Sequence, residues 1–206
     1  MASARPLTAV LAVAVLLLSL SRATGAPPAQ AAPGGQGLYV VCMTTVLASI
    51  VEQVGGPYVK VEAIVPAGFC PGHYDIKPSD VEAVSKADII LGHIAKFPWV
   101  MDLLKAAGRN ETDLIMLHGP WNTPEGAISY VKNITDILCS HPKTNSTMRD
   151  YFTEMNATIC SGLESLAQEL KKKAEDLGVS EVKVICMQWQ VPFVSWLGFN
   201  ITATFP

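Results

Sequence analysis

The sequence predicts an α/β protein that has one parallel-sheet lobe, a long rigid linking helix and the beginning of a second lobe. Short apolar runs alternate with helical segments through residues 38–142, a pattern typical of βαβ units and a parallel sheet. From Lys143 to Leu177 the apolar residues then recur every three or four positions without an interrupting proline. This spacing predicts one amphipathic helix of about 50 Å.

Residues 1–26 predict a secretory signal peptide. Arg5 precedes an apolar run from Leu7 to Leu20, and small residues follow the run, as in a basic start, a hydrophobic core and a cleavage site. The run is shorter than the roughly 20 residues that a membrane span needs, and an uncleaved anchor is the alternative. Residues 27–37, rich in Ala, Pro and Gly, predict a flexible lead-in. We therefore expect the chain to be exported to the periplasm or the cell surface.

Composition and motifs exclude several functional classes. Hydrophobic residues make up 50% of the chain and charged residues 16%, which is not the composition of a disordered protein. The formal net charge of −3 argues against nucleic-acid binding, which requires clustered basic residues. The sequence contains no nucleophile elbow, zinc-protease motif or P-loop, so we expect that the protein is not an enzyme.

The first lobe, residues 38–142, is expected to contain four strands separated by helices. The strands are predicted at Leu38–Val41, Val59–Val65, Asp88–Leu91 and Asp113–Leu117. The helices are predicted at Thr45–Val54, Ser79–Lys86, Pro98–Ala107 and Pro124–Leu138. Ser79 and Glu82 fit a capping box, and Thr123 is expected to cap the helix whose first residue is Pro124.

After the linking helix, assigned to residues 143–178, the second lobe is predicted to begin at residue 179. It is expected to contain a strand at Val182–Ile185, a helix at Val191–Leu197 and a strand at Ile201–Phe205. Because the chain stops at residue 206, we expect this lobe to be incomplete, with an open sheet edge and exposed apolar surface. Such a surface predicts self-association.

Two further patterns concern covalent modification outside the cytosol. Cys139 and Cys160 lie away from the strand ends, and in an oxidising compartment we expect them to pair as a disulfide. Five of the six Asn residues begin an N-x-[ST] sequon, which predicts N-glycosylation of an exported chain, with chance as the alternative. These residues are Asn110, Asn133, Asn145, Asn156 and Asn200.

Ligand-type side chains follow the predicted strands. Cys70 and His73 come after the second strand, His93 after the third, His118 after the fourth, and Met187 after the strand beyond the linking helix. Because the carboxyl ends of parallel strands meet at one edge of a sheet, we expect these residues to converge. Thiolate, thioether and imidazole suit Zn²⁺ or Cu(I). The alternative for each residue is an ordinary place in the core or in a loop.

Three stretches, in this order and spacing, resemble the zinc/manganese-type solute-binding proteins of ABC importers. They are Gly68–Asp80 with its Pro78-Ser79-Asp80 end, His118–Pro124 with Trp121 three positions before Pro124, and Cys186–Phe199. The resemblance covers about residues 38–199. It implies two α/β lobes joined by one long helix, a metal ion as the cargo and an ABC importer permease as the partner.

The sequence departs from the family pattern at the ligand positions. The first family His aligns with Gly72, beside His73, and the second with Gly119, beside His118; the third aligns with Met187. Cys70 replaces an Asp, and the fourth family ligand would lie beyond residue 206. Either the site has been rebuilt around softer ligands or metal binding has decayed.

Softer ligands favour zinc, with copper and manganese as alternatives. The sequence therefore predicts a zinc-binding importer component, and the alternative is a surface adhesin or interaction protein with a degenerate site.

Overall fold

The structure, a computed structural model, describes residues 37–93 and 97–206. The predicted signal peptide, residues 1–26, and the lead-in up to residue 36 lie outside the described residues. Within the described ranges, none of the helices combines the length and apolar content needed to cross a membrane.

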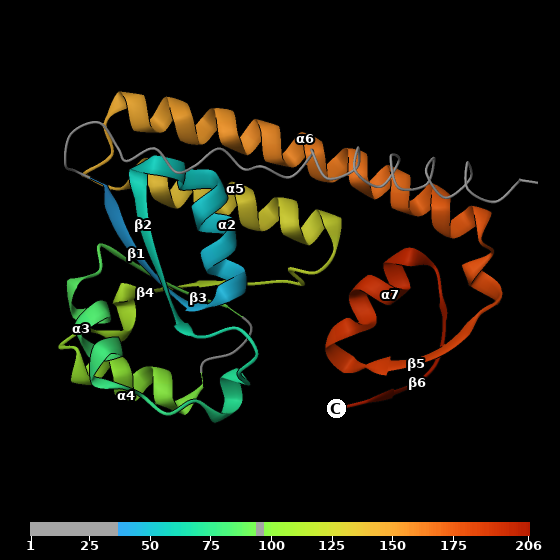
Figure 1. The fold of residues 1–206 in the computed structure, drawn as a ribbon, viewed down its shortest axis with the longest axis horizontal. Helices are drawn as coiled ribbons and strands as arrows, with labels where there is room; N and C mark the ends of the chain where they lie inside the picture. Colours follow the sequence, from blue (N-terminus) through green and yellow to red (C-terminus); the bar gives the residue numbers. More distant parts are fainter. Residues whose placement is uncertain (1–36, 94–96) are drawn as a thin grey trace, which may run out of the picture. The chain divides into compact units, whose positions relative to one another are not determined.

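A parallel four-stranded sheet forms the centre of the first lobe (Figure 1). Its strands are β1 (Leu38–Thr44), β2 (Val59–Val65), β3 (Ile89–His93) and β4 (Leu114–Leu117), in the order β2-β1-β3-β4. All three strand pairs are parallel. The strand order reverses between β1 and β3, and in open α/β sheets a ligand crevice forms outside the carboxyl ends of the strands at such a point.

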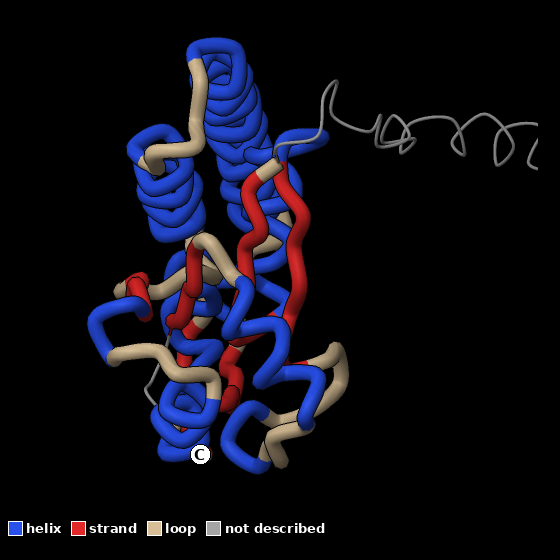
Figure 2. Tube along the Cα trace, turned by 90° about the vertical axis from the view of Figure 1, so that its left-hand side faces the viewer, coloured by secondary structure: helices blue, strands red, loops and turns tan. Residues whose placement is uncertain are grey.

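Helices cover both faces of this sheet (Figures 1 and 2). They are α2 (Thr45–Gly55), α3 (Pro78–Lys86), α4 (Pro98–Ala106), α5 (Pro124–Ser140) and α6 (Ser146–Asp176). Strand β1 shows why: Val40 and Cys42 pack into a core with α2, α5 and α6, whereas Val41 and Met43 pack into a core with α3 and α4. Alternate residues of a strand face opposite sides of the sheet, so a strand made only of apolar residues needs helices packed on both faces of the sheet. The predicted α/β class is confirmed.

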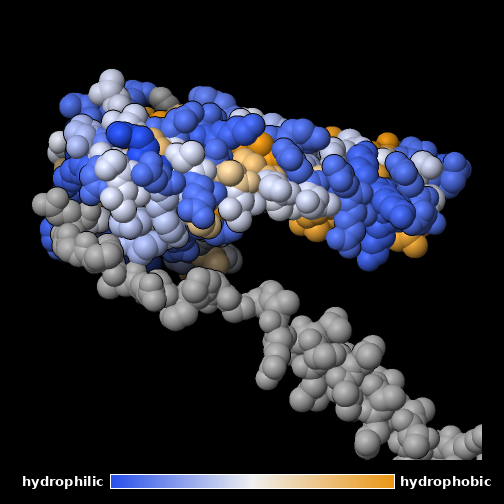
Figure 3. Space-filling view, turned by 90° about the horizontal axis from the view of Figure 1, so that it is seen from above, coloured by the Kyte–Doolittle hydropathy of each residue, from blue (hydrophilic) through white to orange (hydrophobic). Residues whose placement is uncertain are grey.

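Beyond α6 the chain forms a smaller parallel unit. Strands β5 (Lys183–Met187) and β6 (Asn200–Phe205) pair in parallel, and α7 (Val191–Leu197) connects them. Helix α7 contacts α6, where Lys171 Nζ lies 5.1 Å from the centre of the Trp196 ring. Seen from the α6 side, the surface is mostly hydrophilic with isolated hydrophobic spots (Figure 3).

The first residues of the helices show which of the predicted N-caps are formed. Thr123 Oγ1 accepts a hydrogen bond from Gly126 N at 3.1 Å, so the Thr123 cap is confirmed. The capping box of Ser79 and Glu82 is wrong, because α3 begins at Pro78 and Asp80 accepts from the backbone N of Lys77 at 2.8 Å. Helix α6 has 31 residues and begins three residues later than predicted.

The structure does not contain the predicted disulfide, because Cys139 and Cys160 are both free thiols there. Cys139, near the end of α5, lies beside the start of α6: Arg149 donates to its carbonyl oxygen at 3.1 Å, and the Thr153 side chain hydrogen-bonds with its thiol. Cys160 lies seven residues beyond Thr153 along α6, about 10 Å at 1.5 Å per residue. Disulfide-bonded Cα atoms are usually less than about 7 Å apart. The Cys160 thiol donates instead to Asn156 Oδ1 at 3.3 Å.

Candidate functional site

The loop between β2 and α3 carries Cys70 and His73 on its exposed side. Both side chains are exposed, and a short 3-10 helix, η3 (Pro71–His73), closes with a hydrogen bond from His73 N to Cys70 O at 3.1 Å. Trp99 Nε1 donates to Pro71 O at 2.7 Å and ties the loop to α4. The two ligand-type residues are therefore held on an anchored turn at the sheet edge.

A buried carboxylate organises the rest of this loop. Asp80 is only 6% exposed, and its Oδ2 accepts from the hydroxyl of Tyr74 at 2.9 Å and from Lys77 N at 2.8 Å. Burial, together with the hydrogen bond from the Tyr74 hydroxyl to Asp80, raises the pKa of Tyr74 to about 12. A buried carboxylate needs such donors, so the Pro-Ser-Asp motif fixes the loop that precedes the helix.

His93 does not lie on the exposed edge, which corrects the expectation for this residue. Strand β3 continues past its predicted end, so His93 is the last strand residue and pairs with Leu117 of β4. Its side chain is 2% exposed, and its Nε2 lies 2.6 Å from Thr44 Oγ1, in a hydrogen bond that joins β3 to β1. Burial lowers the pKa of His93 to about 4. Its Nδ1 has no partner among the described residues.

The loop between β4 and α5 carries His118 and Trp121. Tyr130 fixes the start of the loop, because its hydroxyl lies 3.2 Å from Gly119 O. On the far side, Asn122 Nδ2 donates to the carbonyl oxygen of Trp189 at 2.8 Å. This bond connects the loop to η6 (Gln188–Gln190), the short 3-10 helix that follows β5.

A pocket of about 350 Å³ lies between this loop and the start of the second unit. His118, Trp121 and Asn122 form one wall, and Gln188, Trp189 and Pro192 belong to the other. Trp121 is 37% exposed and Trp189 is 67% exposed. The pocket follows β4 and β5 at their carboxyl ends, where parallel sheets place their ligands.

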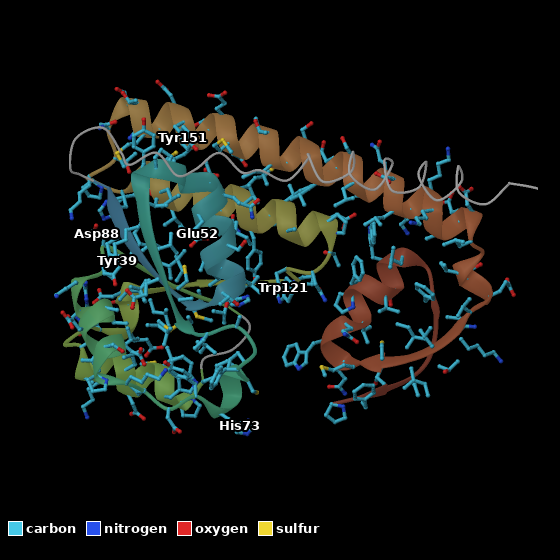
Figure 4. All side chains as sticks on the ribbon, in the orientation of Figure 1. Tyr39, Glu52, His73, Asp88, Trp121 and Tyr151 are labelled. Carbon is cyan, nitrogen blue, oxygen red and sulfur yellow. The ribbon has the colours of Figure 1, made fainter. Side chains whose placement is uncertain are left out.

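The predicted ligands do not form one cluster. Within residues 37–93 and 97–206, no group of three His, Cys, Asp or Glu side chains is placed to hold a metal ion. His73 lies well apart from Trp121 of the pocket wall (Figure 4). Met187, at the end of β5, is 37% exposed, whereas its neighbour Cys186 is buried. A bare ion would therefore need the loops to approach one another.

The two glycines at the family ligand positions differ in what they tolerate. Gly119 has φ +102°, a backbone conformation that favours glycine and strains any residue with a side chain. At Gly72, a Cβ would make ordinary contacts, 3.7 Å from Cys70 Sγ and 3.9 Å from Phe97. A residue with a side chain would thus be strained at position 119 but not at position 72.

The sequons differ in accessibility. Four of the five Asn side chains are exposed, and Asn156 is half-buried and accepts the hydrogen bond from Cys160. Asn145 also serves as the N-cap of α6, since its Oδ1 accepts from Met148 N at 3.0 Å. Glycosylation remains a prediction at all five positions.

Sequence reasoning missed the indole and amide groups of the pocket. Trp121, Asn122 and Trp189 lie in two of the stretches that resemble the solute-binding proteins, but Trp189 comes 67 positions after Asn122 and no local pattern links them. Asp80 was identified within the motif, and its role as the acceptor for Tyr74 depends on the loop conformation.

Comparisons with known proteins identify the family of the chain. Residues 40–188 match the family model described as zinc-uptake complex component A, periplasmic (ZnuA). The manganese ABC transporter substrate-binding lipoprotein PsaA of Streptococcus anginosus is 24% identical over 75% of this chain and 57% of its own length. The iron ABC transporter substrate-binding lipoprotein MtsA of Streptococcus pyogenes serotype M1 is 26% identical over 84% of this chain and 62% of its own. The chain thus spans less than two thirds of these relatives, which are named as binding proteins and not as enzymes.

Solved structures share the fold. A crystal structure of ZnuA superposes with a TM-score of 0.67 and 20% identity, over 82% of this chain and 70% of that one. The metal-dependent lipoprotein YcdH of Bacillus subtilis superposes with a TM-score of 0.66 and 16% identity, over 81% of this chain and 66% of that one.

Proposed function

The chain belongs to the family of the periplasmic component A of zinc-uptake complexes, and from this we propose that it binds a metal ion outside the cytoplasm and delivers it to an ABC importer permease. The observation that carries the proposal is the family match across residues 40–188. The adhesin alternative is not favoured, since the matched relatives are named as substrate-binding lipoproteins of ABC transporters.

Zinc is the cargo that we propose first. The relatives are named for manganese and iron, and manganese prefers harder oxygen ligands to the thiol and imidazoles at this sheet edge. Cys70, His73 and His118 are exposed at the sheet edge, and thiolate with imidazole suits Zn²⁺ or Cu(I) better than Mn²⁺. Because a thiol must lose its proton to bind a metal, the affinity should decrease as the pH is lowered.

The test is the metal content of the exported chain, purified reduced, with Zn²⁺, Cu(I) and Mn²⁺ in competition. We expect bound zinc that decreases in Cys70→Ser, His73→Ala and His118→Ala. His141→Ala, which alters a histidine outside the crevice, is the matched control and should keep its metal. No bound metal at micromolar concentrations would refute the proposal.

We also propose that the β5–β6 sheet mediates self-association with a second copy of the chain. Ile185 is 67% exposed and Phe205 is 48% exposed, and exposed apolar side chains of this kind favour contact with a second copy. Analytical ultracentrifugation should show a dimer that Ile185→Lys dissociates. A monomer at high micromolar concentration would contradict this.

A further inference from the structure

The sequons of this chain are more numerous and more uniform than chance would make them. Five of the six Asn residues begin an N-x-[ST] sequon, although Ser and Thr make up only about one residue in eight, so chance would give about one sequon. All five sequons end in Thr, although the chain contains 13 Ser and 13 Thr. Branching at Cβ restricts the Thr side chain, which fixes the direction of its hydroxyl group. The pattern indicates acceptor sites, and the structure distinguishes among them.

Asn110 begins an exposed sequon in the connection between α4 and β4. Both Asn110 and Thr112 are exposed, and the backbone of Asn110 is extended, with φ −90° and ψ 159°. Asn110 precedes η4 (Glu111–Asp113), a single 3-10 turn, and its backbone N donates to Asp113 Oδ2 at 3.0 Å. An enzyme that binds its acceptor peptide in an extended form can therefore take this segment without unwinding an α-helix.

Asn145 begins a second exposed sequon, at the start of α6. Both Asn145 and Thr147 are exposed, and the backbone of Asn145 is extended, with φ −85° and ψ 178°. Its Oδ1 accepts from Met148 N at 3.0 Å. An N-linked sugar is bonded to Nδ2 and leaves Oδ1 as an acceptor, so a glycan here is compatible with the N-cap of α6.

The folded chain holds the other three sequons in regular structure. They begin at Asn133, Asn156 and Asn200. In the first, Thr135 is 5% exposed and donates to Val131 O within α5 at 2.8 Å. In the second, the Asn is half-buried in the middle of α6 and accepts from the Cys160 thiol. In the third, Thr202 donates to Val184 O across the β5–β6 pair at 3.2 Å. A modifying enzyme would have to break these contacts first.

The two exposed sequons lie at the amino ends of the strands. Asn110 comes just before β4, and Lys143, two residues before Asn145, contacts Asp88 at 2.6 Å, just before β3. In a parallel sheet the amino ends share the edge opposite to the carboxyl ends, where the pocket lies. Asn122, in the pocket wall, is the one Asn residue of the sequence that begins no sequon. Glycans at the amino ends would therefore leave the pocket open.

We propose that Asn110 and Asn145 carry N-linked glycans, which are attached to the folded, exported chain. In the reaction, Nδ2 of the Asn attacks the anomeric carbon of an oligosaccharide that is linked to a polyprenyl phosphate carrier. A carbon–nitrogen bond forms, and the bond from that carbon to the phosphate oxygen breaks. The lipid phosphate leaves with the electron pair, and the amide loses one proton. The inference is independent of the identity of the metal cargo.

The test is peptide mapping by mass spectrometry of the full chain, purified from the cells that naturally produce it. The measured quantity is the fraction of each sequon peptide that carries a glycan. We expect most copies of the peptides with Asn110 and Asn145 to be glycosylated, and at least tenfold lower occupancy at the other three sequons.

Valine variants, made in the same cells, remove the Thr hydroxyl and keep the Asn. Thr112→Val and Thr147→Val should each lose one glycan, which increases the electrophoretic mobility of the chain. Thr158→Val, which makes the same change in the sequon of Asn156, is the matched control and should migrate unchanged. Circular dichroism of each variant checks that it is folded.

The other outcomes overturn the inference in different ways. Equal occupancy of all five sequons would refute attachment to the folded chain. Glycans at the other three sequons in place of Asn110 and Asn145 would refute the assignment of the sites. A chain without any glycan would refute the modification itself and leave the proposed metal-binding function standing.

Discussion

Gly126 is the residue at which a single methyl group should disturb the pocket. It lies in the first turn of α5, where an added Cβ would be 1.7 Å from Pro120 O and 2.8 Å from Pro120 C. Side-chain carbons do not approach backbone atoms within 3.0 Å. In Gly126→Ala the backbone at Pro120 must therefore move by more than about 1 Å. Pro120 lies between His118 and Trp121, so this movement would also displace the pocket wall.

The expected loss of stability combines two terms of opposite sign. Overpacking against backbone costs about 1–3 kcal/mol, whereas alanine is better than glycine inside a helix by about 0.5–1 kcal/mol. We expect Gly126→Ala to lower the free energy of unfolding by about 1–2 kcal/mol. For a chain of this size each kcal/mol corresponds to about 2–4 °C in Tm.

The matched control is Gly162→Ala. Gly162 lies in α6, and no heavy atom is within 4 Å of its added Cβ, so this variant should gain about 0.5–1 kcal/mol. Thermal unfolding measures both variants, and the tryptophan emission, to which Trp121 contributes, reports the loop. Equal stability of the two variants, with unchanged fluorescence, would refute the close contact between α5 and Pro120.

Three further predictions concern the cap, the buried histidine and the cysteines. Thr123→Ala removes the acceptor for Gly126 N and should cost about 1 kcal/mol in urea unfolding; an unchanged midpoint would show that the cap contributes nothing. Burial lowers the pKa of His93 to about 4, below the ordinary value of about 6.5. The stability due to neutral His93 is therefore complete above about pH 6.5 and decreases by about 3 kcal/mol as the pH falls to 4. His93→Gln should unfold with a shallower pH dependence over this window, and equal slopes would contradict the argument. Peptide mapping without reduction should find no peptide linked through Cys139 and Cys160, and finding one would refute the helix register.

The predicted secondary structure was largely correct because it depends on local patterns. Strand β2 coincides with the predicted Val59–Val65, and α7 with Val191–Leu197. The start of α3 was missed because the acceptor that sets it, Asp80, is chosen by its contact with Tyr74. A capping pattern in the sequence offers several acceptors, and burial selects one of them.

The candidate site was predicted less well than the fold. Cys70, His73 and His118 follow the strands as expected, but in the described part of the chain they form no metal-holding cluster, and His93 is enclosed because β3 extends to that residue. Whether a side chain at a strand end is a ligand or a core residue depends on one or two residues of strand length. The alternating pattern of an apolar strand does not determine that length.

The sequence by itself determined the α/β class, the long helix and the order of the ligand-type residues, because hydrophobic period and turn residues act over a few positions. Only the tertiary structure decided which of those residues share a site. It separated Cys139 from Cys160, enclosed His93 beside Thr44, and brought Trp189 to Asn122 across 67 positions. Such contacts depend on how each loop returns to the sheet, and packing of the whole chain determines that path.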